Sequence, residues 1–451
     1  MKVMIVGSGA REHAIAEALC GAPDEDVELY AFMGNRNPGL IRLSEDYEVG
    51  DPTDVDAVAK AAARWDVDLA VVGPEDPLAE GVADRLEEEG VPTFGPKRDP
   101  ARIEWDKGFA RRLMKKYGIE GYPEFGVFED PDEACDFIDE LGKPVAVKPA
   151  GLTGGKGVKV VGDQLKNLEE AKEYVREIFE KEIGGIPKVV IEERCVGEEY
   201  TIQVYTDGRK VLPTPAVQDH PHAYEGDEGP ITGGMGSYSC PDGLLPFLSR
   251  KEYKESIRIL EEAVEAIRKE TGEPYRGVLY GQFMLTADGP VLIEFNCRYG
   301  DPEAMNILPI AEGDLVTLHA SIAEGSMEGD VEFLERATVC KYVVPEGYPE
   351  SSEGEGEPIE VDEECIHRLD AIPYYASVNL EEDGTITMTS SRAVAIVGIG
   401  ERLEEAEEAA ERAIRECVSG EKIRHRSDIG KPETVREKVR RMERIRGRGG
   451  S

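Results

Sequence analysis

Short apolar runs alternate with segments of helical periodicity over the first hundred residues, and this rhythm is the strongest constraint on the fold. Strands are expected at 3–6, 27–32, 69–72 and 91–94, and helices at 12–19, 55–65 and 78–89. Strands that alternate regularly with helices are typical of an open parallel sheet. Residues 1–103 are therefore predicted to form an open parallel α/β sheet domain.

Glycine and proline punctuate the chain after this first unit, at Gly95, Pro96 and Pro100. Beyond them we expect helices at 106–117, 250–271 and 403–417, strands at 145–147, 158–161, 189–193, 278–285 and 290–295, a long functional loop at 213–243, and further strands between 330 and 430. The pattern predicts domains at 1–103, 104–329 and 330–430, the last a small mixed β domain. A basic tail at 431–451 is expected to be a solvated helix or a frayed end.

The charge of the chain limits what it binds. Its 53 Lys and Arg against 93 Asp and Glu give a formal net charge of −40, which argues against a nucleic-acid partner. An anionic substrate must then be held by locally placed Lys or Arg, by helix N-termini or by a metal. No run is apolar over enough residues to cross a bilayer, and the N-terminus is a predicted strand rather than a leader, so we expect a cytoplasmic protein without membrane contact.

The eight cysteines are dispersed, without a CxxC pair or a cluster with histidine. They are Cys20, Cys135, Cys195, Cys240, Cys297, Cys340, Cys365 and Cys417. This spacing suggests neither a zinc site nor a disulfide framework, and buried or unreactive thiols are the better interpretation.

A glycine turn follows the first predicted strand. Gly7, Gly9 and Arg11 lead into a predicted helix, where a phosphate can bind free backbone N–H groups at the positive end of the helix dipole. Glu12 replaces the third glycine of a dinucleotide-binding turn, and the second strand ends at 33–35 without the acid that would hold a ribose hydroxyl. The motif therefore favours a phosphorylated small molecule over NAD.

The segment 146–158, with the sequence AVKPAGLTGGKGV, is a glycine-rich loop between two predicted strands. It is not a P-loop, because Gly157 stands where Ser or Thr should bind magnesium and because a P-loop leads into a helix. Such a hairpin can fold over a triphosphate, with Lys148 and Lys156 neutralising charge. A plain flexible hairpin is the alternative, but two lysines framing four glycines are unusual in a surface turn.

Oxygen-bearing side chains follow two further strands. Glu192 ends one of them and is followed closely by Glu199, so one segment can offer acceptors to an adenine amino group and to ribose hydroxyls, although acidic strand ends are more often simply solvated. Glu294 and Asn296 alternate and so share one strand face, with Gln282 roughly opposite Glu294 across a turn. Hard oxygen ligands on one face suit magnesium that bridges nucleotide phosphates, and a chance surface hairpin is the alternative.

Together these motifs resemble the ATP-grasp superfamily and, within it, the glycinamide ribonucleotide synthetase family of purine biosynthesis. The superfamily resemblance rests on Lys148 with its glycine loop and on 192–199 and 294–296, and the family resemblance on 9–13, 73–78, 232–236 and 298–303. It spans residues 1 to about 430. It implies a central ATP-grasp fold with a lid at about 120–195, and ligation of glycine to 5-phosphoribosylamine with ATP and Mg²⁺ or Mn²⁺.

The resemblance also implies a role for each matching residue. ATP would be bound by Lys107, Lys148, Gly154, Gly155, Lys156, Gly157, Glu192, Glu193, Cys195 and Glu199, with Gln282, Glu294 and Asn296 as metal ligands. Glycine and 5-phosphoribosylamine would lie against Gly9, Arg11, Glu12, Glu75, Thr232, Gly233, Gly234, Met235, Gly236, Asp301, Pro302 and Glu303. Arg298, beside the transferring phosphoryl group, and Asp219 would be the catalytic residues.

The implied reaction passes through glycyl phosphate, from which the sugar amine displaces phosphate. Two rival functions remain open. Another ATP-grasp ligase acting on a purine intermediate, such as a carboxylase or a formate-using transferase, is disfavoured by 232–236 and 298–303. A nucleotide-binding sensor without turnover would have no use for Glu294, Asn296 and Arg298 together. Transient contact with neighbouring enzymes of the pathway is also expected.

Overall fold

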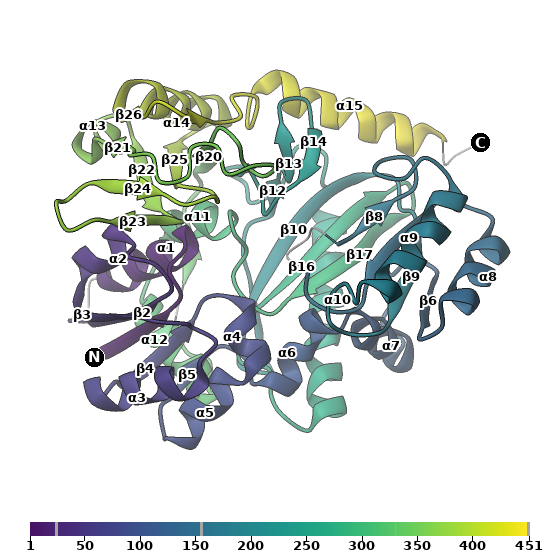
Figure 1. Ribbon diagram of the computed structural model, residues 1–451, viewed down its shortest axis with the longest axis horizontal. Helices are drawn as coiled ribbons and strands as arrows, with labels where there is room; N and C mark the ends of the chain where they lie inside the picture. Colours follow the sequence, from purple (N-terminus) through teal and green to yellow (C-terminus); the bar gives the residue numbers. More distant parts are fainter. Residues whose placement is uncertain (23–25, 154–156, 330, 449–451) are drawn as a thin grey trace.

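The N-terminal domain is the predicted open parallel sheet. The computed structural model describes residues 1–22, 26–153, 157–329 and 331–448 (Figure 1). The first sheet has the order β3-β2-β1-β4-β5, and every neighbouring pair is parallel. Its strands are β1 (Lys2–Val6), β2 (Glu28–Met33), β3 (Ser44–Val49), β4 (Leu69–Val72) and β5 (Thr93–Phe94), and its helices are α1 (Ala10–Cys20), α2 (Pro38–Leu43), α3 (Val55–Trp65), α4 (Glu75–Glu80) and α5 (Val82–Glu88).

One detail of this region differs from the prediction. The helix expected at 78–89 is two helices, because Gly81 adopts a φ of +92° that ends α4 before α5 begins. Pro100 lies in the first turn of α6 (Arg98–Trp105), where a missing N–H costs no helical hydrogen bond, and α7 (Lys107–Tyr117) follows.

A four-stranded antiparallel sheet forms a separate lobe beside the large sheet (Figure 1). Its strands, in spatial order, are β6 (Phe125–Phe128), β9 (Val189–Glu193), β7 (Val145–Pro149) and β8 (Lys159–Val160). Helices α8 (Pro131–Leu141) and α9 (Leu168–Glu180) pack against it, and Ile138, Val175 and Ile191 contribute to a small apolar core of its own. The glycine loop connects β7 to β8, as predicted, but its residues 154–156 lie outside the described part of the chain.

A ten-stranded sheet spans the central and C-terminal parts of the chain. Its main path is β17-β16-β10-β12-β15-β20-β25-β22, with β11 paired to β10 and β27 paired to β20. The strands are β10 (Glu198–Thr206), β11 (Val211–Pro213), β12 (Val217–Asp219), β15 (Gly236–Ser239), β16 (Gly277–Thr286), β17 (Gly289–Asn296), β20 (Ala337–Pro345), β22 (Ala371–Tyr375), β25 (Val394–Gly400) and β27 (Ile423–Arg424). The C-terminal strands therefore extend the central sheet through the pairing of β15 with β20.

The long loop expected at 213–243 is instead built largely of short strands. Besides β12 and β15 it contains the hairpin of β13 (His222–Tyr224) and β14 (Glu228–Ile231). The glycines and prolines that suggested a loop occupy turns between strands too short to show an apolar alternation of their own.

The remaining helices belong to the central and C-terminal parts of the chain. They are α10 (Arg250–Thr271), α11 (Ala304–Ile307), η1 (Leu308–Ile310), α12 (Leu315–Glu324), α13 (Glu363–His367), α14 (Leu403–Cys417) and α15 (Pro432–Arg448). The short strands β18 (Ala311–Glu312), β19 (Glu332–Phe333), β21 (Glu360–Val361), β23 (Val378–Leu380), β24 (Ile386–Met388) and β26 (Val418–Ser419) form two-stranded pairs. Among the described residues, no helix has the length and apolar character required to span a membrane.

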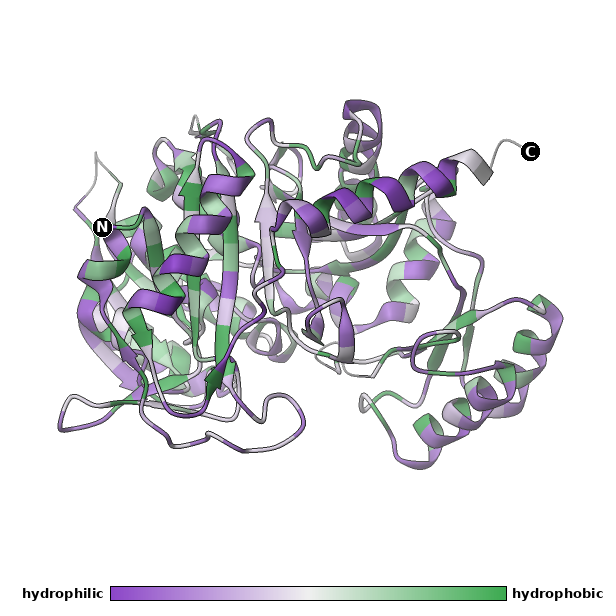
Figure 2. Cartoon of the chain, turned by 90° about the horizontal axis from the view of Figure 1, so that it is seen from above, coloured by the Kyte–Doolittle hydropathy of each residue, from purple (hydrophilic) through white to green (hydrophobic). Residues whose placement is uncertain are grey.

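The basic tail is a helix, as one of the two predicted outcomes, but it is not simply solvated. In Figure 2 the helix α15, which leads to the C-terminus, consists mostly of hydrophilic residues. Val435 and Met442 nevertheless belong to the apolar core that runs from the N-terminal sheet through the large sheet. The tail is therefore packed onto the body of the protein.

A disulfide joins Cys365 in α13 to Cys417, the last residue of α14, across a sequence separation of 52. The expectation of unlinked thiols is wrong for this pair. The two residues are distant in sequence and meet because α13 packs on α14, so their spacing carries no disulfide signature. The other six cysteines are free.

The disulfide should stabilise the C-terminal part of the chain. By restricting the unfolded chain, a cross-link over this separation is expected to contribute about 2–4 kcal/mol to the free energy of unfolding. Cys417→Ser should lower the melting temperature, and a reductant should lower that of the parent protein by a similar amount. The variant serves as its own control, because reductant should leave its melting temperature unchanged. A parent protein that is insensitive to full reduction would contradict the assignment.

Candidate active site

A cavity of about 890 Å³ is lined by residues of the N-terminal domain, the four-stranded lobe and the large sheet. The predicted site residues that line it are Arg11, Glu75, Lys107, Lys148, Glu192, Glu193, Cys195, Glu199, Asp219, Thr232, Gly233, Gln282, Glu294, Asn296, Arg298, Asp301 and Glu303. Those that are described but do not line it are Gly9, Glu12, Gly157, Gly234, Met235, Gly236 and Pro302. Gly154, Gly155 and Lys156 lie outside the described residues. The motifs of the sequence thus largely converge on one cavity.

Lys148 is held by a buried ionic triad. Its Nζ lies 2.7 Å from Oε2 of Glu192, and Nε of Arg111 donates to Oε1 of the same carboxylate at 2.5 Å. Burial opposes the charge on Glu192, but Arg111 and Lys148 outweigh it and lower the pKa of Glu192 to about 2. Both carboxylate oxygens are engaged. The geometry therefore favours a role for Glu192 in fixing Lys148 over the adenine contact that the resemblance implied.

Lys107 brings a second cation to the same end of the cavity. It is the first residue of α7, and its Nζ donates to the carbonyl oxygen of Gly151 at 3.0 Å. Burial lowers the pKa of Lys107, Glu294 opposes that change, and the nearby charge of Lys148 adds to it. A bound polyanion would oppose the effect of burial on Lys107 and favour its charged form.

Three oxygen-bearing side chains meet on neighbouring strands, as predicted. In the antiparallel pairing of β16 with β17, Gln282 is opposite Glu294 and Tyr280 is opposite Asn296. Nε2 of Gln282 donates to Oε2 of Glu199 at 2.8 Å. Burial raises the pKa of Glu199, the Gln282 hydrogen bond opposes this rise, and the charge of Glu294 adds to it. Glu199, Gln282, Glu294 and Asn296 thus form an acidic cluster that lines the same cavity as the two lysines.

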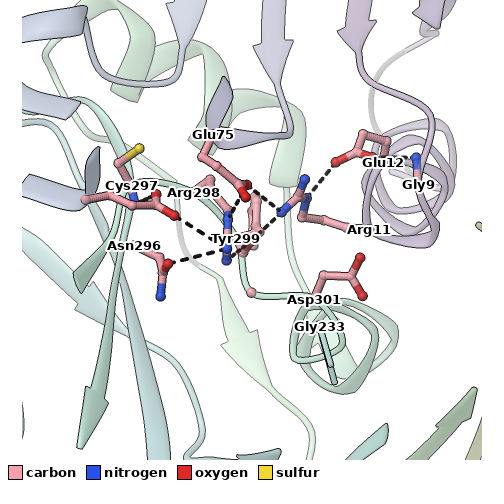
Figure 3. Close-up of polar contacts among 12 residues, drawn as sticks. Gly9, Arg11, Glu12, Glu75, Gly233, Asn296, Cys297, Arg298, Tyr299 and Asp301 are labelled. Atoms are coloured by element: carbon pink, nitrogen blue, oxygen red, sulfur yellow. Dashed lines mark hydrogen bonds and ion pairs between the residues drawn. The ribbon is translucent and has the colours of Figure 1, made fainter. Parts of the chain in front are cut away.

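Arg298 forms the centre of a second ionic set (Figure 3). Its Nε lies 3.0 Å from Oε2 of Glu75, and its Nη2 lies 3.5 Å from Oε1 of Glu104. Arg11 approaches the same Glu75 oxygen at 3.9 Å, and both arginines donate to the carbonyl oxygen of Tyr299. Burial disfavours a charge on Glu75, but Arg298 and Arg11 lower its pKa to about 2. Glu75 therefore remains ionised between two arginines.

The N-terminal glycine turn is already occupied by a side chain. The N–H of Gly9 donates to Oε2 of Glu12 at 2.6 Å, and Nε of Arg11 donates to its Oε1 at 2.5 Å. A Cβ added at Gly73 would lie 2.1 Å from Oε1 of Glu12, and one at Gly7 would lie 2.8 Å from its Cγ. Glycine at positions 7 and 73 therefore leaves space for the Glu12 side chain. The N–H of Gly9, which was expected to be free for a phosphate, instead donates to Glu12.

Acidic residues gather around Arg392 at another part of the cavity. Nη2 of Arg392 lies 3.1 Å from Oδ2 of Asp301, and its Nη1 donates to the carbonyl oxygens of Gly233 and Gly234. Glu303 accepts from the hydroxyl of Tyr280 at 2.9 Å. The chain fold thereby joins the 232–236 and 298–303 motifs in one cluster.

Asp219 is the unpaired member of this cluster. Its Oδ1 is buried and has no hydrogen-bond partner among the described residues. Burial raises the pKa of Asp219 well above its ordinary value, and the charge of Glu303 adds to the rise. Such a carboxyl is ready to pair with a cationic group that enters the cavity. Gly234 has a φ of +106°, and a Cβ there would lie 2.7 Å from this oxygen, so glycine is required beside it.

Sequence analysis missed several residues of the cavity, namely Glu104, Arg111, Arg392, Lys438 and Arg441. The first two are polar residues in helices, where solvent exposure is the ordinary expectation. Arg392 follows a short strand pair, and the last two belong to the tail helix. Only the contacts of the folded chain single them out, since no local motif surrounds them.

Comparison with known proteins finds relatives over the whole chain. Family models described as the N domain, the ATP-grasp (A) domain and the C domain of phosphoribosylglycinamide synthetase match residues 1–104, 105–304 and 338–432. The phosphoribosylamine–glycine ligase of Methanopyrus kandleri is 86% identical, over 99% of this chain and 100% of that protein, and that of Methanocaldococcus jannaschii is 52% identical with the same coverage. The crystal structure of phosphoribosylamine–glycine ligase from Thermotoga maritima matches with a TM-score of 0.79 at 30% identity, covering 95% of this chain and 100% of that one.

Glu104 provides a pH test of the Arg298 ion-pair set. Burial raises the pKa of Glu104 to about 7, although Arg298 opposes the rise. Between pH 4.5 and about 7 the folded chain therefore keeps a proton on Glu104 that the unfolded chain has released. The stability that the protonated Glu104 contributes to the folded state is lost as the pH rises through this range. Relative to the parent, Glu104→Gln should gain stability as the pH rises through this window. Denaturant unfolding at several pH values measures the difference, and a difference independent of pH would contradict the assignment.

Proposed function

The chain belongs to the phosphoribosylglycinamide synthetase family and is a phosphoribosylamine–glycine ligase of purine biosynthesis, and from this premise we propose how its cavity divides the reaction. The reaction joins glycine to 5-phosphoribosylamine and converts ATP to ADP and phosphate. One observation carries the proposal. The cavity connects the buried Lys148, the half-buried Lys107 and an oxygen-rich hairpin, through Arg298, to an acidic cluster with an unpaired carboxyl.

The nucleotide occupies the end of the cavity with Lys107 and Lys148. Its phosphates lie against these two lysines and the glycine loop that ends at Gly157, while the adenine lies beside 193–195 and the ribose beside Glu199. The supporting contacts are the triad that holds the Lys148 side chain in place and the Gln282 hydrogen bond that orients Glu199. Glu192 acts on the nucleotide indirectly, by holding Lys148.

Magnesium or manganese binds at Gln282, Glu294 and Asn296. These donors are hard oxygens, which such cations prefer, and Nε2 of Gln282 is turned toward Glu199, so its Oε1 is left as a ligand. Within the described residues there is no group of three His, Cys, Asp or Glu side chains able to hold a metal. A divalent cation held by Gln282, Glu294 and Asn296 would neutralise negative charge on the nucleotide phosphates.

The chemistry takes place near Arg298. A carboxylate oxygen of glycine attacks the γ-phosphorus of ATP, ADP leaves, and glycyl phosphate forms. The amine of phosphoribosylamine then attacks the carbonyl carbon, and phosphate leaves with the former carboxylate oxygen. Arg298, held by Glu75 and Glu104, is placed to stabilise charge on the transferring group, and the neighbouring residues chiefly position the two substrates.

The two acceptor substrates bind at the other end. The unpaired carboxyl of Asp219 and that of Glu303 receive the ammonium group of glycine, since Oδ1 of Asp219 and the Glu303 side chain are buried and neither carboxyl forms an ion pair among the described residues. The 5-phosphoribosylamine lies between the N-terminal turn and the 301–303 segment, where Arg11 and Arg392 supply positive charge. Thr232 and Gly233 line this end of the cavity. Met235 is fully buried and belongs to the core beneath it, so it does not reach the substrates.

The family excludes the two rival functions for this chain, a ligase for a different purine intermediate and a sensor without turnover. We further propose that the reaction takes place in the cytoplasm, which the acidic composition supports, and that neighbouring enzymes of the pathway contact the chain transiently. Membranes and nucleic acids are not proposed as partners.

An isotope experiment tests the acyl phosphate. Glycine labelled with oxygen-18 in its carboxylate should pass one labelled oxygen to each phosphate released, because that oxygen bridges carbon and phosphorus in glycyl phosphate. Mass spectrometry of the phosphate measures the transfer, and unlabelled glycine in oxygen-18 water is the control that should give no label. Unlabelled phosphate from labelled glycine would remove the intermediate from this mechanism.

A charge substitution tests the metal site. Glu294→Gln removes the only formal charge among the three ligands, so activity should be lost at ordinary magnesium and recover in part at high magnesium or with manganese. Asn296→Ala should be less severe and Gln282→Ala the mildest, because water replaces a neutral ligand more readily. Asp288→Asn, an exposed charge loss in the same hairpin, is the matched control. A magnesium titration of Glu294→Gln that matches the parent in midpoint and turnover would place the metal elsewhere.

A further inference from the structure

The tail helix α15 lies beyond the family's C domain, whose match ends at residue 432. In Figure 1 it crosses the molecule above the β13–β14 hairpin and extends toward the four-stranded lobe. Val435 and Met442 anchor it in the main core, and it contacts β10 and β16. The helix is therefore docked over the strands that we assign to nucleotide binding.

Two cations of α15 line the nucleotide cavity itself. Nη1 of Arg441 donates to Oε1 of Glu198 at 3.1 Å. Nζ of Lys438 lies 3.8 Å from Oε2 of Glu198 and also pairs with Asp227 in the β13–β14 hairpin. Glu198 is only 2% exposed. A carboxylate buried so deeply requires partners, and removing them would leave an uncompensated charge.

Glu198 directly precedes the residue proposed to hold the ribose. It is the first residue of β10, where Glu198 pairs with Leu285 and Glu199 with Met284 of β16. Lys438 also acts on Glu199, because its charge opposes the rise in pKa that burial causes there. A movement of Glu198 toward water would displace the start of β10 and with it Glu199.

Lys438 and Arg441 are not the only attachments of the helix. Nη2 of Arg446, near its C-terminal end, lies 2.8 and 2.9 Å from the two oxygens of Glu252 in α10 and donates to the carbonyl oxygen of Phe247. The apolar contacts and Arg446 together hold α15 on the protein. The helix therefore has attachments that do not depend on Lys438 or Arg441.

We propose that α15 is a wall of the nucleotide end of the cavity, and that Lys438 and Arg441 are positioning residues for ATP. They hold Glu198 at the start of β10 and thereby keep Glu199 where the ribose binds. The inference rests on the proposed position of the nucleotide. It adds to the ATP site two residues of a segment that the family's domain matches do not cover.

Paired substitutions test the proposal. The double variant Lys438→Gln and Arg441→Gln should raise the Kd for ADP and the KM for ATP about tenfold, the effect of losing one charged contact, and leave the KM for 5-phosphoribosylamine unchanged. The control is Arg440→Gln with Arg444→Gln, which removes the same charge from exposed positions of the same helix and should change none of these constants. Equal ADP affinities in the two double variants would overturn the proposal.

A third substitution separates positioning from direct contact and from folding. Adding Glu198→Gln to the Lys438 and Arg441 variant removes the buried charge, so the Kd for ADP should return to within about threefold of the parent value. If affinity stays low although the melting temperature recovers, the cations do not act through Glu198 and the proposal is wrong. Truncation after residue 431 would be less informative, because it strips Val435 and Met442 from the core.

Glu199→Gln distinguishes failure of this inference from failure of the proposed function. If Glu199→Gln leaves ADP binding unchanged, the nucleotide does not lie at Glu199. Both the proposed nucleotide site and the proposed role of α15 are then wrong. If it weakens ADP binding while the Lys438 and Arg441 variant does not, the nucleotide assignment stands and only the role of α15 is overturned.

Discussion

The ion pairs of Arg298 join parts of the chain that no sheet connects. Glu75 begins α4 of the N-terminal domain, Glu104 lies in α6, and Arg298 follows the last strand of the central hairpin. A guanidinium this deeply buried needs its carboxylates, because loss of one leaves an uncompensated charge in a medium of low polarity. The placement of the N-terminal domain against the large sheet is therefore coupled to the charge state of the arginine proposed to assist phosphoryl transfer.

A chain with a net charge of −40 binds an anion only by arranging its cations in advance. Two cations of this cavity are already paired, Lys148 with Glu192 and Arg392 with Asp301. These pairs fix the rotamers of long side chains during folding, so that little conformational entropy remains to be lost when substrates bind. The same carboxylates balance the positive charges of these side chains inside the protein, which a neutral pocket would leave uncompensated.

Local signals made the N-terminal sheet and the oxygen-rich hairpin predictable. The helix Val55–Trp65 has the predicted bounds, and the alternation of Glu294 and Asn296 was enough to place both side chains in the cavity. Partners that meet through tertiary packing left no such signal. Arg111 approaches Glu192 from a helix, Cys365 reaches Cys417 through the packing of α13 on α14, and Lys438 comes from a tail whose composition suggested solvent.

The glycines of the 232–236 motif are required as much by packing as by any substrate. A Cβ at Gly234 would lie 2.6 Å from Cδ of Pro302, and one at Gly236 would lie 2.2 Å from the carbonyl oxygen of Cys340 in β20. The motif therefore presses against the 301–303 segment on one side and against the first C-terminal strand on the other. Arg392, which follows β24, adds a further link between the C-terminal part of the chain and this motif, because its Nη1 donates to the carbonyl oxygen of Gly233. Because these contacts leave no room for a side chain, the C-terminal strands and the substrate end of the cavity form one packed unit, and neither can change shape without the other.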